Sequence, residues 1–195
     1  MSFEIKKIES SFVILALQHN PTILLSGFLK DSGIIDSDEE INFDNSFVTP
    51  AGGEIYLIDK TFINITPNKL VIKSPVDNSP FEKGAKYCKH QTFVSYKAIG
   101  INFKFELKNN SIDKLINFDD DIFEPEHVKV RFSHKKGKCY ITLKNFKDRD
   151  SVFADFNFDY KTQELVKLGN IDFDIVEESK KNLNLAEKKL HEIFA

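Results

Sequence analysis

The sequence predicts an α+β fold, an antiparallel β-sheet with helices packed on one face, in a single domain spanning residues 1–195. The main observation is the segment 92–107, TFVSYKAIGINFKFEL, in which apolar side chains occupy every second position from Ile99 to Phe105. That period of two is typical of a strand with one buried face. The composition agrees, because the chain holds 19 Phe and no Trp, and Phe packs well on sheet faces.

The chain begins with a predicted strand over residues 5–18. Residues 12–17 form a continuous apolar run, which predicts a strand buried on both faces. A helix is expected to follow, with Asn20 as its N-cap and Pro21 at its first position. Gly33 is placed to end that helix in a left-handed cap.

Three strands and a second helix complete the first half. Strands are expected over residues 54–59, 61–66 and 70–73, with the last two joined by a turn at Pro67-Asn68. The acidic residues 36–45 are expected to form a surface loop. Ser79-Pro80-Phe81-Glu82 is a capping-box pattern, which predicts a short helix through residue 88.

The second half is expected to repeat this order. A helix is predicted over residues 109–118, an acidic loop over 119–126, and strands over 127–133, 139–146 and 152–160. Asp174, with Glu177 three residues later, opens a final helix. Its expected apolar stripe consists of Val176, Leu183, Ala186, Leu190 and Ile193. Residues 5–88 and 92–194 can therefore be aligned as two degenerate strand-helix-strands-helix halves.

Charge is segregated along the chain. Residues 127–149 hold eight Lys or Arg and one acid, a charge of +7, so the rest carries −10 to reach the net −3. The chain starts without the apolar core of a signal peptide, and no apolar run has the ~18 residues of a membrane span. Two cysteines do not make a disulfide framework, which favours a reducing cytoplasm and free thiols.

The basic hairpin, residues 128–147, is the strongest candidate for a binding site. If its polar faces coincide, one surface presents Lys129, Arg131, Lys138, Tyr140 and Lys144. Such a surface suits a phosphate backbone, with Tyr140 free to stack on a base. Two alternatives remain open. Lysines guard the solvent side of a sheet edge against aggregation, or the patch docks an acidic protein or a second copy of this chain.

Metal ligation is a weaker hypothesis. Cys88, His90, His134 and Cys139 are the candidate ligands, but they lack the tight Cys or His pairs of zinc sites. The acidic residues 119–126 lack the interleaved spacing of a calcium loop. The sequence therefore predicts no metal ligand and no cofactor.

The sequence contains no recognisable catalytic motif. G-x-S-x-G, Walker and dinucleotide-binding patterns do not occur. An enzyme would have its site near His19, Asn20 and Asn102, where a strand ends and where Gly100 interrupts another. No residue is predicted to be catalytic.

Three segments resemble motifs of one protein family. They are residues 19–29 with NPTIL, residues 62–70 with a strand-PNK-strand hairpin, and residues 96–102 with YKAIGIN. In this order they resemble a family of small bacterial proteins of about this length that has no assigned activity. The resemblance implies a bacterial origin and says nothing about site residues.

Together these observations predict a non-enzymatic bacterial interaction or accessory protein of the cytoplasm, whose partner is another protein or, as a homodimer, the chain itself. The alternatives are a nucleic-acid-binding module that uses the basic hairpin, and an enzyme of unknown class.

Overall fold

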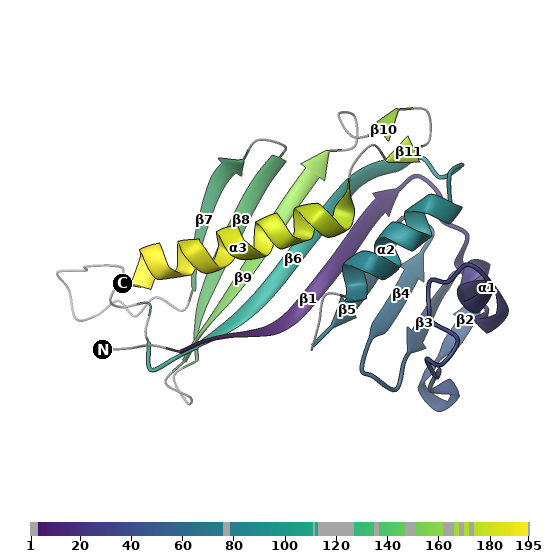
Figure 1. The fold of residues 1–195 in the computed structure, drawn as a ribbon, viewed down its shortest axis with the longest axis horizontal. Coiled ribbons are helices and arrows are strands. Elements are labelled where there is room, and N and C mark those ends of the chain that lie inside the picture. The colour runs from purple at the N-terminus through teal and green to yellow at the C-terminus, as the bar shows by residue number, and fades with distance from the viewer. Residues whose placement is uncertain are drawn as a thin grey trace.

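In the residues that it describes, the computed structural model is mainly β, a large antiparallel sheet with three α-helices (Figure 1). It describes residues 4–75, 79–110, 112, 127–134, 137–146, 151–161, 166–167, 170–171 and 174–194. The strands are β1 (Glu4–Ala16), β2 (Phe47–Thr49), β3 (Gly52–Tyr56), β4 (Phe62–Thr66), β5 (Lys69–Ser74), β6 (Tyr96–Lys108), β7 (His127–His134), β8 (Gly137–Phe146), β9 (Ser151–Lys161), β10 (Val166–Lys167) and β11 (Asn170–Ile171). The helices are η1 (Pro21–Leu24), α1 (Ser26–Asp31), η2 (Phe43–Asn45), α2 (Ser79–His90) and α3 (Ile175–Phe194).

Nine strands form the main sheet in the order β2-β3-β4-β5-β1-β6-β9-β8-β7. The long strands β1 and β6 pair antiparallel at its centre. Outward from β1 come β5, β4 and β3, and outward from β6 come β9, β8 and β7. Each central strand is therefore bordered by the last main-sheet strand of its own half of the chain.

The central strands bury only one face. In β1, Phe12 and Ile14 are fully buried, whereas Leu15 is 41% exposed. The prediction of a strand buried on both faces was therefore wrong. A continuous apolar run does not reveal which alternate set of side chains the fold covers.

Strand β6 begins at Tyr96, later than predicted. Residues 92–94 form a turn instead, and the side chain of Phe93 is 100% exposed. The Tyr96 hydroxyl donates a hydrogen bond to the Gln91 carbonyl at 2.7 Å, which ties the start of the strand to the end of α2.

The first helical segment has the predicted ends. The Asn20 side chain accepts a hydrogen bond from the Thr22 backbone N–H, and Gly33 has a φ of +63°. Between these caps the helix is divided into η1 and α1, because Leu25 is extended.

Helix α2 lies close to the centre of the sheet, in contact with β1, β5 and α3. Gly84 makes this approach possible. A Cβ atom at this position would lie 2.1 Å from the Phe12 ring on β1.

Helix α3 begins at the predicted cap, where the Asp174 carboxylate accepts a hydrogen bond from the Glu177 N–H at 2.9 Å. Of the predicted stripe, Ala186 and Leu190 are fully buried. The buried side of α3 also includes polar side chains, which the predicted apolar stripe did not contain. The Asn182 amide donates a hydrogen bond to the buried Tyr160 hydroxyl at 2.6 Å.

Part of the predicted second half lies outside the described residues. This applies to the acidic loop 119–126 and to the predicted helix 109–118, except for residues 109, 110 and 112. Ile112 is fully buried. Among the described residues, none of the helices is both long and apolar enough to cross a membrane.

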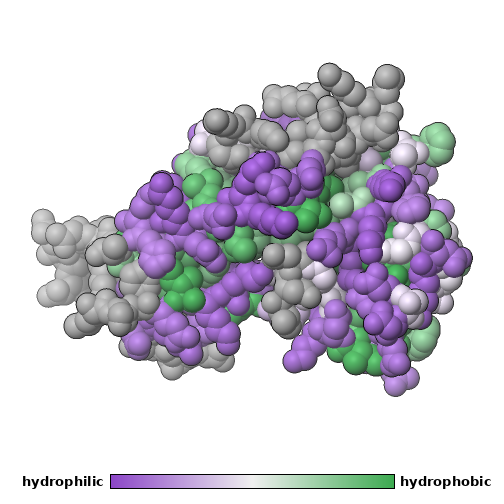
Figure 2. Space-filling model, in the orientation of Figure 1, coloured by the Kyte–Doolittle hydropathy of each residue, from purple (hydrophilic) through white to green (hydrophobic). Residues whose placement is uncertain are grey.

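Side chains alternate across the main sheet. One set packs into the core together with α2, whose Phe81 ring lies 5.4 Å from that of Phe103 on β6. The other set is mostly half-buried or exposed, and we call the surface it forms the outer face. Figure 2, in the view of Figure 1, shows hydrophilic residues over much of α3 and α2.

Candidate functional site

The basic hairpin is formed by β7 and β8, and its polar faces coincide. Arg131 lies opposite Tyr140 and Lys129 opposite Thr142 in the ladder. Because side chains alternate along a strand, Lys138 and Lys144 project on the same side as Tyr140. The structure thus brings all five predicted binding residues together on the outer face.

Strand β9 adds acids to this basic surface. Asp159 lies directly opposite Lys138, and Asp155 opposite Thr142. The carboxylates partly offset the positive potential of the hairpin, because opposite charges across neighbouring strands attract one another. The sequence count missed them, since they lie beyond the basic segment in the chain.

Positive charge exceeds negative charge on the outer face, and the excess lies on β6 to β9, because cations and carboxylates balance on β1 to β5. Among the described residues, ten cations lie on the outer face: Lys6, Lys69, Lys73, Lys104, Lys108, Lys129, Arg131, Lys138, Lys144 and Lys161. Six carboxylates accompany them: Glu4, Glu9, Glu54, Glu106, Asp155 and Asp159. Ten against six gives this face a surplus of four positive charges, in a chain whose net charge is −3.

One row of outer-face residues runs in register across eight strands, from β7 to β3. We call it the central row, and it consists of Arg131, Tyr140, Asn157, Asn102, Ser11, Lys73, Phe62 and Tyr56. Its middle is polar, Tyr140 lies next to Arg131 at one end, and Phe62 and Tyr56 form the other end. Of these eight residues, sequence analysis identified only Tyr140 and Arg131 as binding residues.

Direct contacts join neighbours in the central row. The Asn102 amide donates a hydrogen bond to the Ser11 hydroxyl at 3.3 Å. The Lys73 ammonium lies 5.0 Å from the centre of the Phe62 ring, a cation–π contact. The Phe62 and Tyr56 rings are 4.7 Å apart. At the other end, Lys129 Nζ lies 5.3 Å from the centre of the Tyr140 ring.

The residues of the enzyme hypothesis are not brought together. His19 is buried, with Nδ1 2.7 Å from the Tyr87 hydroxyl of α2. Burial lowers the pKa of His19, so its imidazole is neutral at pH 7. The Asn20 side chain caps η1, and Asn102 lies on the outer face beside Ser11.

A cavity of about 650 Å³ lies beside His19, at the end of β1. Its rim includes Leu17 and Phe93, both largely exposed. None of the described residues that line it is an acid, a lysine or an arginine. The cavity therefore offers His19 no charged partner for acid–base chemistry.

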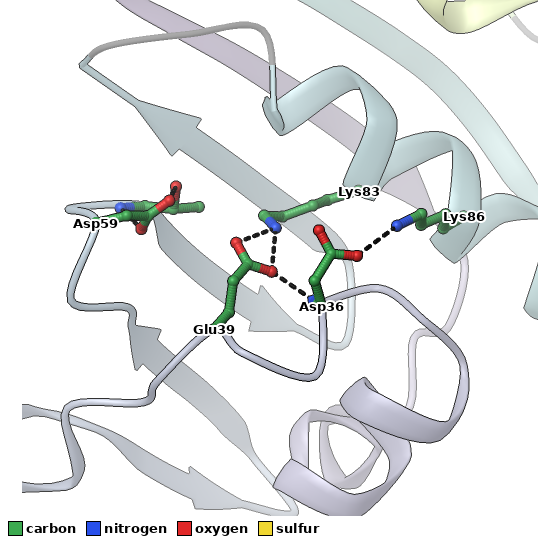
Figure 3. Close-up of polar contacts among 6 residues, drawn as sticks. Asp36, Glu39, Asp59, Lys83 and Lys86 are labelled. Carbon is green, nitrogen blue, oxygen red and sulfur yellow. Dashed lines mark hydrogen bonds and ion pairs between the residues drawn. The ribbon is translucent and has the colours of Figure 1, made fainter.

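A cluster of ion pairs anchors the acidic loop to α2 (Figure 3). Lys83 is 4% exposed, and its ammonium lies 2.5 Å and 2.6 Å from the two carboxylate oxygens of Glu39. The same carboxylate accepts the backbone N–H of Asp36, whose own carboxylate pairs with Lys86 at 3.2 Å. These charges satisfy one another, so the cluster is a structural clamp. It also shows that residues 36–45 are more than a solvated loop.

The two cysteines are free and buried. Burial raises the pKa of the Cys139 thiol to about 12, and it raises that of Cys88 as well. Neither thiol is therefore a nucleophile near neutral pH. Within the part of the chain that the structure describes, no three His, Cys, Asp or Glu side chains are grouped as a metal site would require.

No protein-family model matches the chain, and no curated protein is significantly similar to it.

Proposed function

We propose that this protein binds nucleic acid across the outer face of its sheet. The observation that carries the proposal is the charge of that face, ten cations against six carboxylates in the part of the sheet that the structure describes, in a chain of negative net charge. Phosphate groups are the common polyanionic ligand for such a surface, and counterion release from them drives binding.

The arrangement of the helices supports the same choice of surface. We infer that α2 and α3 pack together on the inner face, since α2 contacts β1, β5 and α3, and α3 contacts β6. An antiparallel sheet covered on one side leaves its other side accessible to a ligand. The two halves of the fold would then contribute to one continuous binding surface.

Fluorescence anisotropy with labelled single-stranded DNA, duplex DNA and RNA tests the proposal, at about 50 mM and about 200 mM salt. We expect binding that weakens steeply with salt, and a loss of at least about tenfold in Lys129→Glu/Arg131→Glu. The matched control is Lys180→Glu/Lys188→Glu, which changes the charge equally on exposed positions of α3.

Absence of binding at low salt, or equal losses in both double variants, would contradict the proposal. An acidic protein or a second copy of the chain would recognise the same cations, so the interaction-protein hypothesis remains a prediction. It would be favoured if the protein bound no nucleic acid and formed a dimer, by sedimentation, that Lys129→Glu/Arg131→Glu dissociates.

A further inference from the structure

The central row carries an aromatic ring in each half of the sheet, a feature that the charge of the outer face does not explain. Tyr140 lies on β8 and Phe62 on β4, each two strands away from the central pair β6 and β1. Both rings are half-buried on the outer face, so part of each is accessible. Each half of the sheet therefore presents an aromatic ring at the same distance from the centre, and Tyr56 lies beyond Phe62 in the first half.

A lysine accompanies each of these rings. Lys73 Nζ is 5.0 Å from the centre of the Phe62 ring, and Lys129 Nζ is 5.3 Å from that of Tyr140. An aromatic surface beside a flexible cation is the pairing that binds a nucleotide, because the base stacks on the ring while the ammonium reaches the phosphate. The pairing occurs at both rings, with Lys129 one register position outside the central row, and a third pair on the outer face, Lys104 with Phe153, lies off the row.

We propose that the outer face binds single-stranded nucleic acid laid along the central row, with bases stacked on Tyr140 and on Phe62. This inference rests on the proposed function and specifies its ligand. In a duplex the bases are already stacked on one another, so they cannot offer their faces to side chains of a sheet. Unpaired bases can, and sheet aromatics stack on them in other single-strand-binding folds.

The dimensions set the length of the ligand. Five strand spacings of about 4.8 Å separate β8 from β4, which places the two rings roughly 24 Å apart. That distance corresponds to about seven nucleotides at the stacked spacing of ~3.4 Å, and to fewer when the strand is extended. Between the rings, the exposed amide of Asn157 can donate to and accept from a base edge.

The test is anisotropy with labelled oligothymidylates of about four, eight and sixteen nucleotides, and with a duplex. We expect Tyr140→Leu and Phe62→Leu to weaken binding of the longer oligonucleotides by about five- to a hundredfold each. These leucine variants keep apolar volume in the sheet, and circular dichroism checks that they fold. The matched control is Phe43→Leu, since Phe43 is 72% exposed but lies on η2, off the outer face.

Oligonucleotide length adds a second readout. Four nucleotides cannot reach both rings, so the shortest oligonucleotide can bind at either one: each single variant should weaken its binding only slightly, because the other ring remains, and the Phe62→Leu/Tyr140→Leu double variant should weaken it much more. On the longer oligonucleotides the two losses should accumulate.

The outcomes separate this inference from the proposed function. If no oligonucleotide binds at low salt, the proposed function itself is wrong. If binding is salt-dependent and lost in Lys129→Glu/Arg131→Glu, but unchanged in Phe62→Leu and Tyr140→Leu, then only the stacking inference is overturned. Tighter binding of the duplex than of the longest oligonucleotide would also overturn it.

Discussion

Adding a single methyl group to α2 should destabilise this protein, although it improves the helix. Gly84 lies inside α2, and a Cβ at this position would be 2.1 Å from Cδ1 and 2.3 Å from Cε1 of Phe12. The Phe12 ring is completely buried, so it has no free space to move into. We therefore expect Gly84→Ala to separate α2 from β1 locally.

The magnitude follows from two opposing terms. Replacing Gly by Ala inside a helix gains about 1 kcal/mol, whereas overpacking a dense core costs up to about 3 kcal/mol. The free energy of unfolding should fall by about 2 kcal/mol, which lowers Tm by roughly 4–8 °C in a domain of this size. Urea unfolding and a thermal melt followed by circular dichroism measure both quantities.

Two further variants isolate the cause. Gly27 is a helical glycine of α1 with nothing within 4 Å of the added Cβ, so Gly27→Ala should be neutral or stabilising by up to ~1 kcal/mol. In the Phe12→Ala background all three contacting ring atoms are gone, and Gly84→Ala should then raise stability. A Gly84→Ala protein as stable as Gly27→Ala would refute the reasoning.

Three other predictions concern buried polar groups. The pKa of His19 is lowered in the folded protein, so as the pH falls the unfolded chain takes up the proton first. The contribution of His19 to the free energy of unfolding should be complete above pH ~6.5 and should fall below that pH by at most about 1.4 kcal/mol per pH unit. Urea unfolding of His19→Gln should lack this pH dependence. Lys83→Met leaves the Glu39 carboxylate without its buried partner and should lower the free energy of unfolding by about 3 kcal/mol, whereas Lys86→Met, at an exposed ion pair, should lower it by less than about 1 kcal/mol. Equal urea midpoints for the two variants would contradict this. Neither cysteine thiol should react with a disulfide reagent at pH ~8 until the protein unfolds, because both are buried. Rapid labelling of the native protein would show that burial does not protect the thiols.

Local signals predicted the elements well where the chemistry is local. Asn20 and Asp174 cap their helices because each side chain reaches a backbone N–H two or three residues away. The alternation of β6 was readable because one set of side chains is apolar throughout. A continuous apolar run does not show which face of a strand is buried, so the prediction failed at Leu15, which lies in such a run and is nevertheless exposed.

The candidate site was predictable only in part, for a different reason. Within one hairpin, two neighbouring strands lie side by side, so the sequence placed Arg131 and Tyr140 on one surface on the condition that the polar faces coincide, as they do. The central row also needs the pairing of β1 with β6 and of β6 with β9, strands that lie far apart in the chain. Lys73 and Phe62 could be assigned to a sheet face from the sequence, but not to the row that contains Tyr140.

A bulge in β1 decides which residues reach the outer face. The register with β6 shifts by one between Lys7 and Glu9. Since one residue of slip moves every side chain to the opposite face, Lys6 and Glu9 share the outer face only because of this shift. Without it, Glu4 and Lys6 would turn into the core, because the buried Phe12 and Ile14 fix the face of the strand beyond the bulge. The charged start of β1 therefore reaches the outer face through one irregularity of backbone pairing, which no pattern of residue types in this segment announces.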